Sequence, residues 1–362
     1  MPAKKSSRFR IAIIGLGDLG QRLALKLADH PAVGELLLLG RQTEAGSALA
    51  RLVNACGDCR ARFMALDALN EDAVASMLAA ERPDLLVQCA SLISPWLLFE
   101  RHDPLAKTLL QAGFALQLPA QLAVVHRVMR ACRAADFRGP VVNCSFPDAT
   151  HPVLACAGLA PTVGVGNAGM ILGLVRATLR DHGITWPLRL LAHHAHVGAV
   201  ATANVARLAA EIPPPRLFAG DNELPPEWAF AGPALPQTRE LNSLTAAHAS
   251  QVIGALLPDS ATLRTAVPGP LGLPGGWPVI MGNGAITLDL PSQVSQAEAL
   301  AYHQSAAVAD GIARIDADGT VHLTTHLQQT VAAIAPELAE PLSLDQAFPR
   351  FLLLQDLLRR PV

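Results

Sequence analysis

The chain has 362 residues, a length that suits two domains, and 51% of them are hydrophobic against 16% charged. This composition supplies enough apolar material for a sizeable core and excludes a disordered chain. The net charge of −2, without a basic cluster beyond Lys4 and Lys5, excludes nucleic acid as the main partner, because binding its backbone needs clustered cations.

The apolar runs of the sequence are short. The longest, such as ELLLLG, fall far below the roughly 20 residues that cross a membrane. The basic and then apolar N-terminus superficially looks like a secretory signal, but its apolar run is too short and leads into a glycine turn. Cys56 and Cys59 form the single CxxC motif and have no second pair at zinc-ligand spacing. We therefore expect a cytoplasmic protein with free thiols, without a metal site and without a membrane partner.

Residues 8 to 30 form a pattern of buried strand, glycine turn and amphipathic helix. Gly15, Gly17 and Gly20 match GxGxxG, in which the glycines allow a tight turn, close approach to a pyrophosphate, and close helix packing. The free N–H groups and the dipole at the helix N-terminus favour phosphate. GVGNAG at 164–169 also matches, but it does not follow a clean buried strand at the start of a domain. The first motif therefore predicts a dinucleotide-binding turn.

The second predicted strand, residues 34–42, ends without a carboxylate. NAD-specific domains usually place Asp or Glu there to hold the ribose hydroxyls. This chain has Gly40, Arg41 and Gln42 instead, and a guanidinium can hold a 2′-phosphate with two hydrogen bonds. The sequence favours NADP(H), and a solvated loop arginine is the alternative.

A third strand ending near Asp67, a helix, and a fourth strand from Leu85 to Cys89 complete the first segment. Strands that alternate with helices indicate a parallel sheet with right-handed crossovers. The pattern GR…LD…PDLLVQCA over residues 10–92 resembles the NADP-binding half of saccharopine-dehydrogenase-like oxidoreductases. The residues predicted to bind the cofactor, with Ser91 beside the nicotinamide ribose, are Gly15, Gly17, Asp18, Leu19, Gly20, Arg41, Gln42, Asp67, Cys89, Ala90 and Ser91.

The middle of the chain predicts a helix at 119–135, a strand GPVVNCS, a helix, a short strand TVGVG and a long helix. This order is similar to that of lactate and malate dehydrogenases. The resemblance places Asn143 at the family's Asn-Pro corner, where it would orient the substrate or the carboxamide, although Pro147 is spaced more widely than usual. It also places His194 of AHHA at the position of the catalytic histidine.

The sequence departs from that family at two points. The helix MILGLVRATL carries no carboxylate to partner the histidine, and the loop SLISPWLL carries no arginine pair for a carboxylate. We therefore expect a substrate that lacks a carboxylate at that point or is larger and more apolar. Because Arg101 lies just beyond the loop, a substrate with an acidic group is the alternative.

The segment LRLLAHHAHVG, residues 188–198, reads as a strand in which His194 and His196 share a face and His193 faces away. A metal would need a third ligand such as His151 or Asp148. General acid–base catalysis fits these histidines better than metal binding, because the pKa of a histidine lies near neutral pH. We predict that His194 is catalytic, ahead of His196, and polar histidines without a role are the alternative.

Short-chain reductases need a Tyr-x-x-x-Lys pair, and this class is excluded because the single tyrosine, Tyr302, is followed by Ala306 at the lysine position. Residues 211–237 are rich in proline and read as an ordered loop or lid. A helix at about 239–257, a turn in which Trp277 could equally wall a pocket or serve packing, and hairpins at Asn283-Gly284 and Asp318-Gly319 predict an α+β unit. The apolar faces of the closing helices suit either the core or a dimer seam.

These patterns predict an α/β fold with an N-terminal doubly wound Rossmann domain at 1–165 and a C-terminal α+β domain with antiparallel hairpins at 166–362. The predicted function is that of an NADPH-dependent oxidoreductase, a homodimer that transfers a hydride to a carbonyl or imine carbon of a small to medium substrate. Reductive amination of the opine or saccharopine type is an alternative. A regulatory protein that binds NADP(H) without catalysis is a third possibility.

Overall fold

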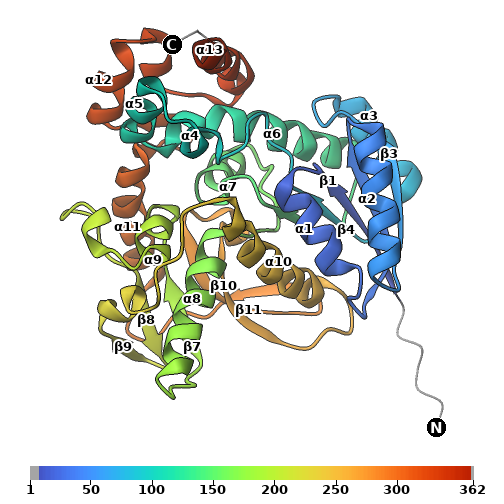
Figure 1. Cartoon of the computed structure of the whole chain (residues 1–362), viewed down its shortest axis with the longest axis horizontal. Coiled ribbons are helices and arrows are strands. Elements are labelled where there is room, and N and C mark those ends of the chain that lie inside the picture. The colour runs from blue at the N-terminus through green and yellow to red at the C-terminus, as the bar shows by residue number, and fades with distance from the viewer. Residues whose placement is uncertain (1–7, 360–362) are drawn as a thin grey trace.

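The computed structural model describes residues 8–359 and shows a mixed α/β molecule (Figure 1). The strands are β1 Phe9–Ile14, β2 Val33–Gly40, β3 Arg60–Ala65, β4 Leu85–Gln88, β5 Val141–Asn143, β6 Val163–Gly164, β7 Leu188–Leu191, β8 Arg216–Ala219, β9 Asn222–Leu224, β10 Leu263–Pro268, β11 Gly276–Gly282, β12 Ala285–Leu288, β13 Ile312–Ile315 and β14 Val321–Leu323. The α-helices are α1 Asp18–Leu27, α2 Thr43–Cys56, α3 Glu71–Glu81, α4 Leu97–Glu100, α5 Pro104–Ala112, α6 Leu118–Ala134, α7 Pro147–Cys156, α8 Asn167–Asp181, α9 Val197–Ala201, α10 Asn242–Leu256, α11 Gln296–Ala307, α12 Thr325–Ala332 and α13 Ala347–Arg359.

The first six strands form one parallel sheet in the order β3-β2-β1-β4-β5-β6. This is the doubly wound order in which the chain reverses direction across the sheet between β1 and β4. Ligands of such sheets bind outside the carboxyl ends of the strands at that reversal. The predicted N-terminal fold class is confirmed.

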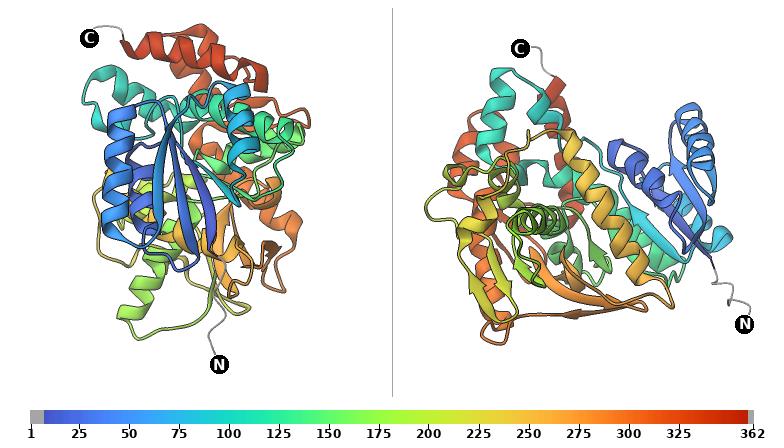
Figure 2. Two further views of the ribbon diagram at one scale, coloured as in Figure 1. Left: turned by 90° about the vertical axis from the view of Figure 1, so that its right-hand side faces the viewer. Right: turned by 60° about the horizontal axis from the view of Figure 1, so that its bottom comes forward.

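Side chains that alternate along β1 build two cores, one on each face of the sheet. Ile11 and Ile13 pack with α1, α2 and α10 on one face, whereas Ala12 and Ile14 pack with α3 and α6 on the other. Helix α10 comes from the second half of the chain and lies beside α1, as Figure 2 shows. A distant segment therefore completes the wall next to the glycine turn.

The second half contributes three small antiparallel sheets, β7-β8-β9, β10-β11-β12 and β13-β14. The predicted hairpins at Asn283-Gly284 and Asp318-Gly319 are confirmed as β11–β12 and β13–β14. The proline-rich segment 211–237 is only partly a loop, because it also forms β8 and β9. Strand β8 pairs with β7, so the segment is tied into a sheet rather than free as a lid.

The closing helices return to the first half of the molecule (Figure 1). Helix α12 packs on α5, and α13 packs on α6. Leu327, Leu354 and Leu357 are buried in the same core as α3 and α6. These leucines of the closing helices therefore form core within this chain, whereas Leu352 and Leu353 of α13 are exposed.

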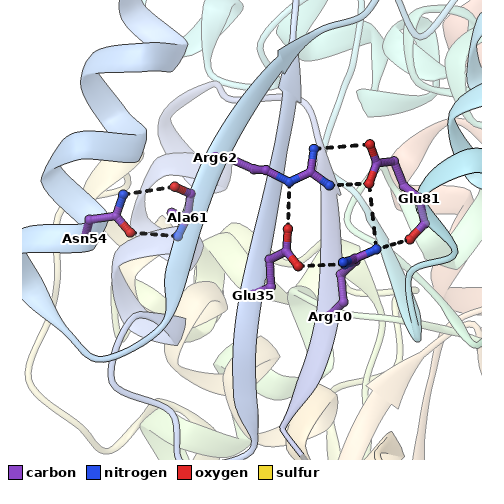
Figure 3. A network of polar contacts seen from close by, with 6 residues as sticks. All are labelled: Arg10, Glu35, Asn54, Ala61, Arg62 and Glu81. Carbon is purple, nitrogen blue, oxygen red and sulfur yellow. Dashed lines mark hydrogen bonds and ion pairs between the residues drawn. The ribbon is translucent and has the colours of Figure 1, made fainter.

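A network of charges joins the strands near their amino ends (Figure 3). The Nε atoms of Arg10 on β1 and Arg62 on β3 donate to the Glu35 carboxylate on β2 at 2.8 and 2.6 Å. Arg62 also pairs with Glu81 at the end of α3. The network lies at the end of the sheet opposite the glycine turn, so it serves the scaffold.

Between residues 8 and 359 no single helix is long and apolar enough to cross a membrane. Helices α5 and α6, taken together with the short helix between them, have the length and apolar composition of a membrane span, but the two are bent by 106° relative to each other. Helix α6 is largely buried against the sheet and α13.

Candidate active site

The three glycines after β1 occupy three different environments. Gly15 has a φ of +96°, and a Cβ there would meet the Ala90 nitrogen at 2.4 Å. A Cβ on Gly20 would meet the Gly15 carbonyl oxygen at 2.0 Å, so both positions require glycine for packing. A Cβ on Gly17 would meet no atom within 4 Å. The turn is therefore tight at two glycines and open at the third, as the approach of a pyrophosphate requires.

A groove of about 400 Å³ runs along the carboxyl ends of the strands next to this turn. Arg41 and Gln42 lie exposed at the tip of β2, and Asp67 lies exposed after β3. The structure brings all eleven predicted cofactor residues together in this groove: Gly15, Gly17, Asp18, Leu19, Gly20, Arg41, Gln42, Asp67, Cys89, Ala90 and Ser91. Their role as cofactor ligands stays a prediction.

The start of α1 is suited to an anion. Gly17 is the N-cap and supplies no side-chain cap, so the first N–H groups of the helix are open toward the groove. The Asp18 carboxylate accepts hydrogen bonds from Arg22 and from Asn242 of α10. Burial alone would raise the pKa of Asp18, but these contacts lower it overall, so the carboxylate stays ionised and neutralised by Arg22. A dinucleotide phosphate therefore fits this groove.

A second hollow, a cavity of about 480 Å³, opens directly from the groove. Its wall is mostly apolar and includes Trp96, Phe99, Phe114 and Phe146. Six residues line both spaces and so make them continuous: Leu19, Pro95, Trp96, Gln121, Cys144 and Asn242. A group bound at the inner end of the groove would thus face a ligand in the cavity.

His194 lies in the wall of this cavity, but it is not in a strand. Strand β7 ends at Leu191, and residues 194–196 form a single 3-10 turn. The His194 ring packs against the rings of Phe114 and Phe146, with centroid distances of 4.1 and 5.0 Å, and the two phenyl rings also contact each other. Its side chain is 22% exposed, and no residue of the described chain hydrogen-bonds to its Nε2. Nε2 is therefore free to meet a ligand.

The partner of His194 is Asp310, which sequence reasoning missed. The Nδ1 atom of His194 lies 2.7 Å from Oδ1 of Asp310, at the end of the short helix Val308–Asp310. Burial alone would lower the pKa of His194, but the charge and hydrogen bond of Asp310 outweigh it and raise the pKa. Burial would raise the pKa of Asp310, and its two histidine neighbours lower it far below the usual range. The pair is thus poised to hold a proton on the imidazole.

The other two histidines lie apart from the cavity wall. His193 is 1% exposed, with Nδ1 3.2 Å from the second oxygen of Asp310. His196 accepts from the His193 backbone N–H through Nδ1 and contacts the Pro213 carbonyl through Nε2. Burial chiefly lowers the pKa of His196 to about 3. The prediction that His194 and His196 share a face is wrong, because the strand ends before them, and His196 serves the turn rather than proton transfer.

Three further residues with a predicted or possible role at the site line neither space, which corrects the prediction for Asn143 and leaves Trp277 with its packing role. Asn143 is fully buried and bonds with Ser145 and Thr150, so it holds the β5–α7 turn and lines neither space. Arg101 donates to Asp103 and the Leu358 carbonyl, away from the cavity. Trp277 is fully buried and packs in the core. None of these side chains can contact a ligand in the positions observed.

No protein-family model matches the sequence, and no curated protein matches it. Solved structures do match. A lactate dehydrogenase, MGS-M5, from a Medee basin deep-sea metagenome library is 13% identical, with a TM-score of 0.50 over 84% of this chain and 97% of that one. A lactate dehydrogenase from Eimeria maxima, solved with NADH and oxamate, is 11% identical, with a TM-score of 0.51 over 84% and 93%.

A putative glucosidase, lplD from Bacillus subtilis, is 12% identical, with a TM-score of 0.55 over 97% of this chain and all of that one. The chain shares its fold with these proteins. The shared architecture is a six-stranded parallel sheet of order 3-2-1-4-5-6 with small antiparallel sheets after it. At such low identity the likeness concerns the fold alone. The resemblance of residues 10–92 to saccharopine-dehydrogenase-like proteins stays a prediction.

Proposed function

We propose that the chain is an NAD(P)H-dependent oxidoreductase that reduces a carbonyl or imine carbon. The observation that carries the proposal is the cavity histidine paired with a buried carboxylate beside an open glycine turn. His194 and Asp310 line the cavity, which is continuous with the groove that begins at Gly17. A cofactor site and a proton donor in one continuous space are what hydride transfer to a carbonyl requires.

A nicotinamide dinucleotide bound in the groove would supply the hydride. The protonated imidazole of His194 donates a proton from Nε2 to the oxygen or nitrogen of the substrate. Asp310 holds Nδ1 and fixes the ring, and the backbone N–H of His194 donates to Asp148 at 2.9 Å. The rings of Phe114 and Phe146 pack against the imidazole and cover part of its surface. Such proton transfer contributes about 10² to 10⁴ in rate.

NADP(H) is the proposed cofactor because the tip of β2 carries Arg41 and no carboxylate. The Arg41 side chain is exposed in the groove wall, and no ion pair joins it to another residue in the part of the chain that the structure describes. It is free to bind a 2′-phosphate.

One feature of the cavity weighs against the regulatory alternative, and two enzymatic alternatives stay open. A regulatory protein would not need a histidine–carboxylate pair in a hollow beside the cofactor groove. Glycoside hydrolysis, the activity named for lplD, is a second candidate, because lplD matches the whole fold and NAD-dependent glycosidases do not use the usual pair of carboxylates. The single carboxylate in the described cavity wall, Asp310, therefore does not separate the two candidates, whereas release of the aryl group from an aryl glucoside with NAD present would. Reductive amination is a variant of carbonyl reduction, in which turnover needs an amine together with the carbonyl compound.

The test is a titration of the protein with NADPH and NADH, followed by a screen of carbonyl compounds with and without amines. We expect tight NADPH binding, weaker NADH binding, and NADPH oxidation that His194→Gln slows by about 10²- to 10⁴-fold without changing cofactor affinity. An unchanged rate in His194→Gln would remove the histidine from the mechanism. Failure to bind either dinucleotide would overturn the proposed function. The division at residue 165 and the homodimer also stay proposals, to be checked by limited proteolysis and sedimentation.

A further inference from the structure

We propose that the cavity selects an uncharged substrate, one that carries a neutral hydrogen-bonding group beside its reacting carbon, which Gln117 and Gln121 bind. This inference rests on the proposed function and names its substrate class. The neutral group must both donate and accept hydrogen bonds, as a carboxamide or a hydroxyl does. The rest of the substrate is apolar.

The first observation is a pair of buried amides without partners. Gln117 is 1% exposed, and neither its Nε2 nor its Oε1 has a hydrogen-bond partner within residues 8–359. Gln121 is 3% exposed, and its Nε2 is likewise unpartnered there. Buried polar groups are nearly always hydrogen-bonded, because leaving them unpaired costs stability. Both residues line the cavity, but the unpartnered atoms are themselves buried, so the amides must turn toward the cavity for a ligand to supply the missing partners.

The second observation is where these amides lie. Phe114 and Gln117 are the ends of the short 3-10 helix that leads into α6, and residues three apart in such a helix share a face. The Phe114 ring packs on His194 at 4.1 Å, which places Gln117 on the side of the proton donor. Gln121 follows one helical turn later and lines both the groove and the cavity. The two amides thus lie side by side, next to the place where a reacting carbon would meet the cofactor.

The third observation is the distribution of charge. In the described cavity wall the charged groups are Arg207 and the neutralising pair of His194 and Asp310. Arg207 is exposed and contacts Thr202, so its charge is largely solvated. A carboxylate on the substrate would lie beside the amides without a buried cation, which is unfavourable. The amide Oε1 of Gln117 would also find no donor on a carboxylate.

The apolar remainder of the substrate would contact apolar side chains of the cavity wall. Trp96, Phe99 and Phe146 line the same cavity, and Met170 and Val197 extend the apolar surface. Aromatic and aliphatic groups of this kind bind an apolar ligand by removing its surface from water.

The experiment uses three matched ketones with one phenyl group each. They are 2-oxo-2-phenylacetamide, 2-hydroxy-1-phenylethanone and 2-oxo-2-phenylacetate, and they differ in carrying an amide, a hydroxyl or a carboxylate. Calorimetric titration of the full chain, with NADPH present and absent, measures binding, and NADPH oxidation is followed separately. We expect at least one neutral ketone to bind about ten-fold more tightly than the acid.

Gln117→Met is the decisive variant, and Gln251→Met, at an exposed site on α10, is its matched control. Gln117→Met should abolish the preference for the neutral ketone and raise the melting temperature, because it removes a buried unpaired amide. The control should change neither. A purely structural role for Gln117 would instead lower the melting temperature.

Equal or tighter binding of the acid overturns the inference, and loss of that binding in Arg207→Gln would identify the competing site. A neutral preference that survives in Gln117→Met also overturns it, as does the failure of all three ketones to bind at millimolar concentration. Neutral binding that depends on Gln117 but gives no NADPH oxidation supports the inference and counts against the proposed function. The inference about the substrate and the proposed function can therefore be contradicted independently.

Discussion

The contact between His194 and Asp310 joins residues 116 positions apart, and it decides the protonation state of the cavity histidine. Asp310 raises the pKa of His194, so the acid form persists to higher pH. Reduction should therefore slow as pH rises through that raised pKa. In Asp310→Asn the slowing should begin at lower pH, and kcat should fall by about 10²-fold. Initial rates of NADPH oxidation across pH, at saturating cofactor, measure both effects.

A surface pair of the same kind provides the control. Asp316 lies 2.7 Å from His322 and is 39% exposed, far from the cavity wall. Asp316→Asn should leave the pH profile unchanged. If Asp310→Asn matched the wild-type profile, Asp310 would not be the group that positions His194.

Substitution by alanine at Gly17 and at Gly20 gives a second prediction. The change at Gly17 should weaken cofactor binding, whereas the change at Gly20 should destabilise the fold. The Cβ of Gly17→Ala would meet no protein atom, so the free energy of unfolding should change by less than about 1 kcal/mol. It would occupy the open side of the turn, and NADPH affinity should fall by about ten-fold or more. Gly20→Ala would press on the Gly15 carbonyl and should destabilise the fold by about 1 to 3 kcal/mol. Urea unfolding and NADPH titration separate the two effects.

Arg41 should control the choice between the two dinucleotides. Hydrogen bonds to a charged group are worth about 1.5 to 3 kcal/mol, so Arg41→Ala should weaken NADPH binding by about 10- to 100-fold and leave NADH binding unchanged. Arg51→Ala, at an exposed site on α2 outside the groove, is the control. Equal losses for NADPH and NADH would show that Arg41 does not read the 2′-phosphate.

At the scale of elements, the turn after β7 explains why residues 188–198 were wrongly predicted to continue as a strand. Leu188–Leu191 pair with β8, and the chain then closes a capping box in which His193 and His196 bond each other's backbone. These bonds compete successfully with further strand pairing, so the histidines leave the sheet at its end. The turn presents His194 alone to the cavity.

The charge network at the amino ends of β1, β2 and β3 should contribute modestly to stability. Burial would raise the pKa of Glu35, but Arg62 and Arg10 lower it overall from 4.5. A lowered carboxyl pKa adds stability that is present above pH 4.5 and is lost as pH falls through the folded pKa. Glu35→Gln should therefore cost about 0.5 to 1 kcal/mol at pH 7, and less below pH 4.5. Urea unfolding at both pH values checks this, and a cost that did not shrink in acid would contradict it.

At the scale of the whole molecule, buried neutral histidines should make the fold sensitive to mild acid. Burial lowers the pKa of His151 and His248 from 6.5 to about 4, and that of His196 to about 3. The unfolded chain takes up these protons first, so stability is full above pH 6.5 and is lost as pH falls toward 4. The loss should reach about 1 kcal/mol per histidine in the first pH unit below 6.5, as urea unfolding can show.

His194 acts in the opposite sense, since its raised pKa adds stability at low pH that is lost as pH rises through the folded value. His151→Gln should flatten the acid slope, whereas His102→Gln, at an exposed site, should leave it unchanged. An acid slope that is the same in the wild type and both variants would contradict the assignment to buried histidines.

The sequence predicted local features well and distant pairings poorly. The glycine turn, the alternation of strands and helices in the first half and both hairpins follow from periodicity and turn residues, which act between near neighbours. Asp310 ends a short helix with no motif around it, so nothing local marks it as a partner of His194. The same holds for Gln117 and Gln121, which read only as polar positions at the start of a helix.

By itself the sequence determined a doubly wound sheet with an open glycine turn at its switch point, because backbone conformation and hydrophobic alternation specify both locally. Only the tertiary structure decided which histidine faces the cavity, which carboxylate holds it and which amides lie near it. The closing helices α12 and α13 pack on α5 and α6, and the segment before them carries Asp310 to His194. The proposed active site depends on side chains that come into contact only after the chain has returned on itself, and packing rather than local propensity determines those contacts.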